Sequence, residues 1–258
     1  MSTEFDWAVW PETYDRIILD EVDSTNAEAI RRAPGITRPT WVMARRQTAS
    51  RARRGRKWEF IDGNFAASLL IKPDYGAPRA ALETYVASYS LLMALRDPSV
   101  APSGHYTLKW PNDVLLNGGK VAGILLESSG TADRLDWLVI GIGVNLAGAP
   151  HPSEVEERAL RPVSVMGETG VAVRPEALLE WLASFYDQHT RLLMDEVGFD
   201  AIRRLWLAQA AGLGQPITAR TGNQEAKGIF ETVDEDGNLV LRTRDGLRRI
   251  AAADVYFD

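Results

Sequence analysis

Six short apolar runs that favour β-strands are spread over the first 146 residues of a chain of 258 residues. They comprise residues 16–19, 41–44, 66–71, 106–110, 121–127 and 135–146. Apolar residues also recur at helical spacing in residues 26–32, 79–95 and 175–194. Short runs of this composition form buried strands, and helices between such strands cover the sheet. The sequence therefore predicts an α+β fold with a mixed β-sheet flanked by helices.

The pattern changes toward the C-terminus. A further helix is predicted over residues 199–211, and the glycine-rich segment at residues 212–216 would end it. After this segment the chain alternates short apolar runs with polar turns, which is typical of small β domains. We therefore predict two domains, a larger one at residues 1–211 and a small C-terminal β-barrel at residues 212–258.

The composition narrows the functional classes. The formal net charge of -6 argues against general affinity for nucleic acid, so DNA is not an expected partner. With no cysteine, the chain has no disulfide framework, no thiolate nucleophile and no Cys-based metal site. The three histidines lie far apart and lack the spacing of a zinc site. Apolar runs are too short to span a bilayer and the N-terminus lacks a signal pattern, so we expect a cytoplasmic protein without a membrane partner.

Residues 45–57, which we call the cation loop, hold seven cations and no acid. Basic runs are usually solvated faces, and some of them bind nucleic acid. Here, however, an apolar stretch follows at residues 63–71, which places the cations on a loop that enters a buried strand. Several guanidinium forks among small residues suit the oxygens of a phosphate or carboxylate. The loop therefore predicts a site for a small anion.

Four further motifs combine polar side chains with turn signals, at residues 23–26, 109–113, 117–120 and 141–145. Each also has an ordinary explanation as a helix cap, a turn, a hairpin or a closely packed strand. Hydroxyl and amide groups at a helix start can equally receive a polar ring or a carboxylate. Lys120 enters an apolar strand, where its ammonium must stay solvated or find an anion. The Walker and dinucleotide-binding loops are not found.

Taken in order, these five motifs resemble those of the biotin protein ligases, and the resemblance covers nearly the whole chain. They read Asp-Ser-Thr-Asn at 23–26, Gln-Thr-Ala-Ser-Arg-Ala-Arg-Arg-Gly-Arg-Lys-Trp at 47–58, Lys-Trp-Pro-Asn-Asp at 109–113, Gly-Gly-Lys-Val-Ala-Gly-Ile-Leu at 118–125 and Gly-Ile-Gly-Val-Asn at 141–145. The resemblance implies a catalytic domain of the class II synthetase-like biotin/lipoate ligase type, followed by an SH3-like C-terminal barrel.

The resemblance also implies a two-step reaction. Biotin and ATP with Mg²⁺ would form biotinyl-5′-AMP and pyrophosphate, and a lysine of a biotin carboxyl carrier protein would then attack this acyl-adenylate to form an amide. The default carrier in this family is a subunit of acetyl-CoA carboxylase. Such a ligase needs no nucleophile of its own, which suits a chain without cysteine, because its work is positioning and charge stabilisation.

By family position, the resemblance assigns the site residues to overlapping groups. The biotin-binding group is Ser24, Thr25, Asn26, Gln47, Arg51, Ala52, Arg53, Lys120 and Gly123, of which the first four would hold the ureido ring. The nucleotide-binding group is Arg53, Arg56, Trp58, Lys109, Asn112, Lys120 and Asn145, with Arg56 at the pyrophosphate and Trp58 and Asn145 at the adenine. Lys120 and Arg53 are the catalytic candidates, because cations at the α-phosphate stabilise the charge that grows in the transition state. Mg²⁺ would accompany the ATP phosphates, with Asp113 as its candidate contact.

Two features depart from the family pattern. Ser50 and Ala52 replace glycines of the cation loop, and a Cβ at a position that needs positive φ would cost about 1 kcal/mol. We therefore expect weaker biotin affinity or faster loss of the adenylate, in an enzyme that is still active. Only 22 residues precede Asp23, too few for the N-terminal winged helix-turn-helix domain of some relatives, so we expect a ligase without repressor function.

Three other functions stay open beside this one. A lipoate or octanoyl ligase would share the fold, although the glycine-rich loop with histidine expected there is not found. A sensor that binds biotin or its adenylate without catalysis is suggested only by Ser50 and Ala52. An RNA-binding protein would use the cation loop and the barrel, and the net charge disfavours it. The oligomeric state also stays open, including a homodimer formed through sheet edges.

Overall fold

The computed structural model describes residues 9–56, 58–101, 103–156, 158–194, 198–221 and 224–257. Its centre is a seven-stranded mixed sheet in which the strands lie in the order β1-β2-β3-β7-β6-β5-β4. The strands are β1 (Asp15–Val22), β2 (Thr40–Gln47), β3 (Phe65–Ile71), β4 (Tyr106–Lys109), β5 (Asp113–Leu116), β6 (Gly119–Gly130) and β7 (Leu135–Val144). β1 and β2 run parallel, and the other neighbouring pairs are antiparallel.

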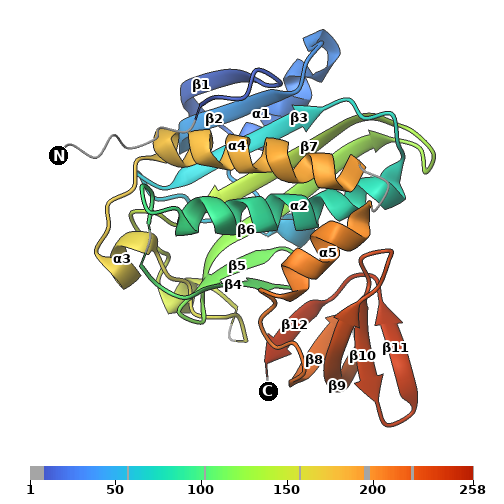
Figure 1. Ribbon diagram of the computed structural model, residues 1–258. Coiled ribbons are helices and arrows are strands. Elements are labelled where there is room, and N and C mark those ends of the chain that lie inside the picture. The colour runs from blue at the N-terminus through green and yellow to red at the C-terminus, as the bar shows by residue number, and fades with distance from the viewer. Residues whose placement is uncertain are drawn as a thin grey trace, which may run out of the picture.

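Helices flank this sheet on both faces, which confirms the predicted fold class. They are α1 (Thr25–Arg32), α2 (Ala77–Arg96), α3 (Val165–Thr169), α4 (Pro175–Met194) and α5 (Phe199–Leu207), with short 3₁₀ turns at Ala33–Gly35, Arg53–Gly55 and Pro152–Glu154. Figure 1 shows α2 and α4 across one face and α1 behind the strands. In the described part of the chain, no helix has the length and apolar character that crossing a membrane requires.

Strand alternation explains why the two faces differ, because successive side chains point to opposite sides of a sheet. Leu69 and Ile140 belong to the large core beneath α2 and α4. Their strand neighbours Leu70 and Val139 instead form a small apolar cluster with Ala29 of α1. The helix α1 covers only part of its face, and the rest of that face carries the polar motifs.

The helix predicted over residues 199–211 is shorter than expected, since α5 ends at Leu207. Tertiary pairing competes with the helix after that point. The backbone nitrogen of Leu108 donates to the carbonyl of Gln209 (2.9 Å), and that of Ala211 donates to the carbonyl of Leu108 (2.7 Å). Residues 209–211 therefore satisfy the free edge of β4 instead of continuing the helix.

The C-terminal residues form a second, five-stranded antiparallel sheet with the order β11-β10-β9-β8-β12. Its strands are β8 (Pro216–Thr221), β9 (Gln224–Val233), β10 (Leu239–Thr243), β11 (Gly246–Ile250) and β12 (Asp254–Phe257). Within the described residues this sheet is open, because β11 and β12 lie at opposite edges. It joins the larger sheet through Trp110, whose Nε1 donates to the hydroxyl of Tyr85 (2.8 Å), which in turn donates to the carbonyl of Gly237 (2.6 Å).

Candidate active site

A cavity opens on the face of the large sheet that α2 and α4 leave uncovered. It is lined by the start of α1, the cation loop, the turn between β4 and β5, strands β6 and β7, residues 156 and 158–160, and β12. Every candidate site residue predicted from the sequence lines this cavity, with the exception of Asn145. The structure therefore brings together motifs that are spread from residue 24 to residue 123.

Small residues form the floor of the cavity in two rows across the sheet. In the first row, Ala66 pairs with Gly143, which pairs with Gly123. Trp58 lies over this row, since a Cβ added to Gly143 would be 3.0 Å from its ring and one added to Gly123 would be 3.3 Å away. In the second row, Gly141 lies beneath Asn26, and a Cβ there would be only 2.0 Å from Asn26 Oδ1. The glycines predicted to allow a close approach thus make room for these two side chains.

One end of the cavity, which we call the amide end, consists of Ser24, Thr25, Asn26 and Gln47. Ser24 caps α1 by accepting a hydrogen bond from the backbone of Ala27. The backbone nitrogen of Thr25 donates to Gln47 Oε1 at 2.7 Å, which joins the helix start to the end of β2. Capping and site formation therefore use the same short segment.

Beneath the amide end lie two residues that sequence reasoning missed as site residues. Ser68 of β3 is fully buried, and its hydroxyl lies 2.8 Å from Thr25 Oγ1 and 2.6 Å from Asn26 Oδ1. Glu127 of β6 accepts from Asn26 Nδ2 at 2.7 Å. A serine and a glutamate interrupting otherwise apolar strands were the available signals, but neither indicated which motif they would meet.

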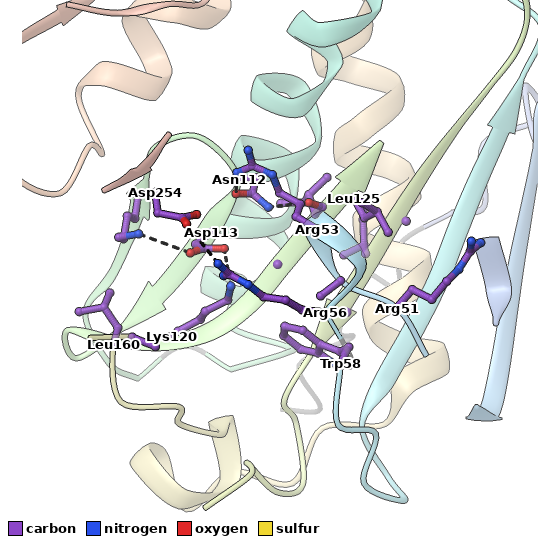
Figure 2. A pocket seen from close by; sticks show the side chains of 18 of the residues that line it. Arg51, Arg53, Arg56, Trp58, Asn112, Asp113, Lys120, Leu125, Leu160 and Asp254 are labelled. Carbon is purple, nitrogen blue, oxygen red and sulfur yellow. Dashed lines mark hydrogen bonds and ion pairs between the residues drawn. The ribbon is translucent and has the colours of Figure 1, made fainter. Parts of the chain in front are cut away.

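The opposite end, which we call the cation end, consists of Arg53, Arg56, Lys109 and Lys120 around Asp113. Lys120 Nζ lies 2.7 Å from Asp113 Oδ1, and Lys109 Nζ lies 3.7 Å from Asp113 Oδ2. The ammonium of Lys120 also lies 5.7 Å from the centre of the Trp58 ring, within cation–π range. Figure 2 shows Lys120, Arg56 and Asp113 close together, with Arg51 lying apart from them.

Burial and charge act against each other at Asp113. Burial alone would raise the pKa of its carboxyl group, but Lys120, Lys109 and Arg53 together hold that pKa below its ordinary value. For Lys109, burial dominates and lowers the pKa of the ammonium despite the neighbouring carboxylate. Asp113 is therefore a carboxylate that balances several cations, and both of its oxygens face lysines rather than an open metal site.

The remaining cations are also held by neighbouring groups. Arg53 Nη1 donates to Asn112 Oδ1 (2.8 Å), and Asn112 Nδ2 donates to the carbonyl of Ile124 (2.7 Å). Arg56 pairs with Glu156 (2.9 Å) and with Asp254 of β12 (3.2 Å). Glu156 and Asp254 lie outside the five motifs and had no pattern that could have found them. They bring the C-terminal sheet to the edge of the cavity.

The cation loop is closed at its base by Ser50 and Trp58. The Ser50 hydroxyl donates to the carbonyl of Trp58 (2.9 Å), and the backbone nitrogen of Trp58 donates to the carbonyl of Ser50 (3.3 Å). Ala52 has a φ of -122°, and Asn117 is the non-glycine residue with positive φ in the described part of the chain. The backbone strain considered for Ser50 and Ala52 is therefore absent. Lys57, which belongs to the predicted loop, lies outside the described residues.

Asn145 is the candidate that the structure does not bring into the cavity. Its side chain is buried, with Nδ2 donating to the carbonyl of Val163 (3.1 Å) and Oδ1 accepting from Asn64 Nδ2 (3.3 Å). These bonds connect β7 to the segment that precedes α3. The predicted contact of Asn145 with adenine stays a prediction.

The two ends of the cavity suit different parts of a ligand. Hydroxyl and amide groups at the amide end can hydrogen-bond a neutral polar ring, whereas the cation end can hold phosphate or carboxylate oxygens. In the described residues, no group of three or more His, Asp or Glu side chains is placed to hold a metal ion. The arrangement therefore suits ligands that combine a neutral polar ring with phosphate or carboxylate groups, and its cations can stabilise charge that develops on such oxygens.

Comparison with known proteins gives matches over both parts of the chain. The model of the Biotin/lipoate A/B protein ligase family matches residues 19–145, and that of the Biotin protein ligase C terminal domain matches residues 212–258. The chain is 52% identical over 240 residues to the biotin--[acetyl-CoA-carboxylase] ligase of Paracoccus denitrificans, covering 93% of this chain and 99% of that protein. It is 32% identical over 219 residues to the bifunctional ligase/repressor BirA of Bacillus subtilis, covering 84% and 65%.

A solved structure agrees with these sequence matches. The biotin protein ligase from Aquifex aeolicus in complex with biotin and ATP has a TM-score of 0.79 and 26% identity to this chain. The match covers 95% of this chain and 99% of that one.

Proposed function

The chain belongs to the biotin protein ligase family, and we propose that it is an ATP-dependent biotin protein ligase that modifies a biotin carboxyl carrier protein. The observation that carries this proposal is the single cavity with an amide end and a cation end. Biotin has a neutral ureido ring and an anionic carboxylate, and ATP has a triphosphate, so the two substrates together match both ends. The relative from Aquifex aeolicus, with biotin and ATP bound, supports the same pairing of substrates.

In the first step, a carboxylate oxygen of biotin attacks the α-phosphorus of ATP and the bond to the β-phosphate oxygen breaks. Biotinyl-5′-AMP forms, and the electron pair leaves with pyrophosphate. We assign the ureido ring to Ser24, Thr25, Asn26 and Gln47, and the biotin carboxylate to Arg51 and Arg53. Lys120 and Arg53 stabilise the charge on the α-phosphate oxygens, while Arg56 holds the pyrophosphate. Ala52 and Gly123 let the backbone approach biotin, and Trp58, Lys109 and Asn112 contact the nucleotide.

In the second step, the amine of the carrier lysine attacks the acyl carbon of biotinyl-5′-AMP. An amide bond forms and the amine nitrogen loses a proton to solvent, while the bond between the acyl carbon and the phosphate oxygen breaks and AMP leaves with the electron pair. Lys120 stabilises the phosphate of AMP as it departs. The reaction uses no covalent intermediate on the enzyme, in keeping with a cation end that holds charge and offers no activated nucleophile.

The proposal also includes how Mg²⁺ reaches the site and which carrier protein is modified. Both oxygens of Asp113 face lysines, so we propose that Mg²⁺ arrives with the ATP phosphates as part of the substrate. The proposed carrier is the biotin-bearing subunit of acetyl-CoA carboxylase, by analogy with the relative from Paracoccus denitrificans. A cytoplasmic location and a lack of DNA binding complete the proposal, and the net charge of -6 supports the latter.

The test is pyrophosphate release from ATP by the purified protein, with biotin or lipoate as the acid and with Lys120→Ala as the variant. Release with biotin alone, reduced roughly 100-fold or more in the variant, is expected. Release with lipoate would instead favour a lipoate ligase. Biotin binding without any pyrophosphate would favour a sensor and would overturn the assignment as an enzyme.

A further inference from the structure

Glu127 lies beside the amide end, on the same face of β6 as Gly123 and Leu125. Its neighbour across the sheet is Val139, which packs in the small apolar cluster under α1. The side chain of Glu127 is 26% exposed, so a charged group stands at the border of an apolar cluster and the cavity. Such a group needs partners, because an unpaired charge near apolar surroundings is costly.

Glu127 accepts hydrogen bonds from two residues that we assign to biotin. Glu127 Oε2 accepts from Asn26 Nδ2 at 2.7 Å and from Arg51 Nη2 at 3.2 Å. On its other side, the Asn26 amide meets the buried hydroxyl of Ser68, 2.6 Å from its Oδ1. Directly beneath it, Gly141 makes room for the amide, because a Cβ there would lie 2.0 Å from Asn26 Oδ1. The amide of Asn26 is thus held from three directions.

We propose that Glu127 is a positioning residue, which fixes the orientation of the Asn26 amide for recognition of the ureido ring. An ionised carboxylate can only accept hydrogen bonds, so Asn26 must turn Nδ2 toward Glu127. Its Oδ1 must then face Ser68, whose hydroxyl can donate. This arrangement leaves two groups of Asn26 for the ligand in fixed positions. They are the second N–H of Nδ2 and a lone pair of Oδ1.

The contact with Arg51 gives the carboxylate its counter-charge. Arg51 lies at the amide end, apart from the cluster of Lys120, Asp113 and Arg56 (Figure 2). A neutral amide in place of Glu127 could donate as well as accept, so the Asn26 amide could turn over and lose its single orientation. This inference rests on the proposed function and adds a determinant of biotin recognition outside the cavity-lining residues.

The experiment compares Glu127→Gln, which keeps the size of the side chain, with Glu21→Gln, an exposed glutamate paired with Arg46. Pyrophosphate release gives KM for biotin and for ATP separately. We expect KM for biotin to rise roughly tenfold in Glu127→Gln, with KM for ATP and kcat within twofold of the wild type. Glu21→Gln is expected to match the wild type in all three.

A double-mutant cycle with Asn26→Ala shows whether Glu127 acts through Asn26. Once Asn26 is alanine, Glu127→Gln should add no further rise in KM for biotin. Full additivity, or an unchanged KM for biotin in the single variant, would overturn the proposal. The proposal would also be overturned if both KM values rose equally and the melting temperature fell, because that result indicates a general structural role.

Calorimetric measurement of ligand binding distinguishes an effect of Glu127 through Asn26 from an effect through Arg51. It does not depend on turnover. Biotinol, in which an alcohol replaces the carboxyl group, should lose the same factor of affinity as biotin in Glu127→Gln. A loss confined to biotin would mean that Glu127 acts through Arg51 on the carboxylate, which contradicts the proposal. If wild type and Glu21→Gln bind biotin but release no pyrophosphate, the proposed function fails while the binding comparison still tests Glu127.

Discussion

The amide end and the cation end of the cavity are held together in different ways. At the amide end, Thr25 and Gln47 bond each other as neutral groups from α1 and β2. At the cation end, Lys120 and Arg56 are paired with the carboxylates Asp113 and Asp254. The first end is a built receptor whose shape exists before any ligand arrives. The second is a set of charges balanced by the protein's own anions.

This difference has an energetic consequence. Neutral hydrogen bonds contribute roughly 1 kcal/mol each. The amide end can form hydrogen bonds to a ligand without breaking the hydrogen bonds that its residues make to one another. Removing one partner of a buried ion pair costs about 3–5 kcal/mol, because the other charge is left uncompensated. Substitutions at the cation end should therefore change folding stability as well as function, whereas those at the amide end should change mainly biotin binding.

The largest expected effect is that of Asp113→Asn, which leaves Lys109 and Lys120 without their carboxylate. We expect a loss of about 3 kcal/mol in the free energy of unfolding, measured by urea denaturation near pH 7. The matched control is Asp20→Asn, whose side chain is 91% exposed although paired with Arg45. That change should cost under about 1 kcal/mol. An equal cost for both would show that Asp113 does not balance the cation end.

The difference in unfolding free energy between the wild type and Asp113→Asn also depends on pH, and the sign of this dependence is defined. The pKa of Asp113 is lowered in the folded state, so its contribution to stability is present above the carboxyl pKa of the unfolded chain. That contribution is lost as the pH falls through the lowered, folded value. The difference between wild type and Asp113→Asn should therefore shrink on acidification, and a difference that grew would contradict the assignment.

The next effect belongs to the amide end. Gly141→Ala would place a Cβ 2.0 Å from Asn26 Oδ1 and displace that amide, while Gly143→Ala would meet Trp58 at 3.0 Å. We expect KM for biotin to rise roughly 100-fold in Gly141→Ala with KM for ATP nearly unchanged, a difference of about 2.7 kcal/mol. Gly143→Ala should raise KM for ATP a few-fold instead. Both KM values are obtained from the rate of pyrophosphate release at varied concentrations of biotin and of ATP.

Gly35→Ala serves as the control for this pair, because a Cβ there would meet nothing within 4 Å. Its two KM values should equal those of the wild type. If Gly141→Ala raised both KM values alike, the two ends would not be separate in function, and the comparison would lose its basis.

The sequence allowed the cavity-lining residues of both ends to be predicted, but not the partners that hold them in place, for physical reasons. Helix capping is local, so the residues 23–26 that begin α1 could be recognised together with their possible ligand. The resemblance to the biotin protein ligases, carried by the five motifs, likewise predicted that Arg53 and Lys120 belong to one site. Strand order decided the rest, because only the pairing of β3, β7 and β6 sets Ser68 and Glu127 beneath Asn26.

The partners of Arg56 could not be predicted because they come from segments outside the five motifs. Glu156 follows a 3₁₀ turn and Asp254 begins β12, and neither carries a local pattern. Asn145 shows what a motif leaves undetermined. Its position in a motif predicts a ligand contact, which stays a prediction, and the motif gave no sign of the two protein partners that hold its amide in the structure.

A smaller effect concerns the base of the cation loop. Ser50→Gly removes the hydroxyl that bonds the Trp58 carbonyl, so we expect biotinyl-5′-AMP to dissociate about fivefold faster, equivalent to roughly 1 kcal/mol. Ala52→Gly should change the rate less than about twofold, because Ala52 already has an ordinary extended backbone. Stopped-flow dissociation of the adenylate measures both. Slower dissociation in Ser50→Gly would restore the expectation drawn from the sequence, that serine weakens retention.

The smallest expected effect tests whether the protein's own carboxylates compete with ATP for the cation end. Glu156 pairs with Arg56 at 2.9 Å, and both side chains are about half exposed, so the pair is weak and its anion can be replaced by phosphate. Glu156→Gln should lower KM for ATP about twofold and leave KM for biotin unchanged, with the gain disappearing at high salt. Glu231→Gln, which breaks the exposed pair with Arg242 in the C-terminal sheet, is the matched control and should change neither constant. A higher KM for ATP in Glu156→Gln would mean that Glu156 orients Arg56 for the nucleotide, so that the cation end, like the amide end, is prepared in advance by its protein partners.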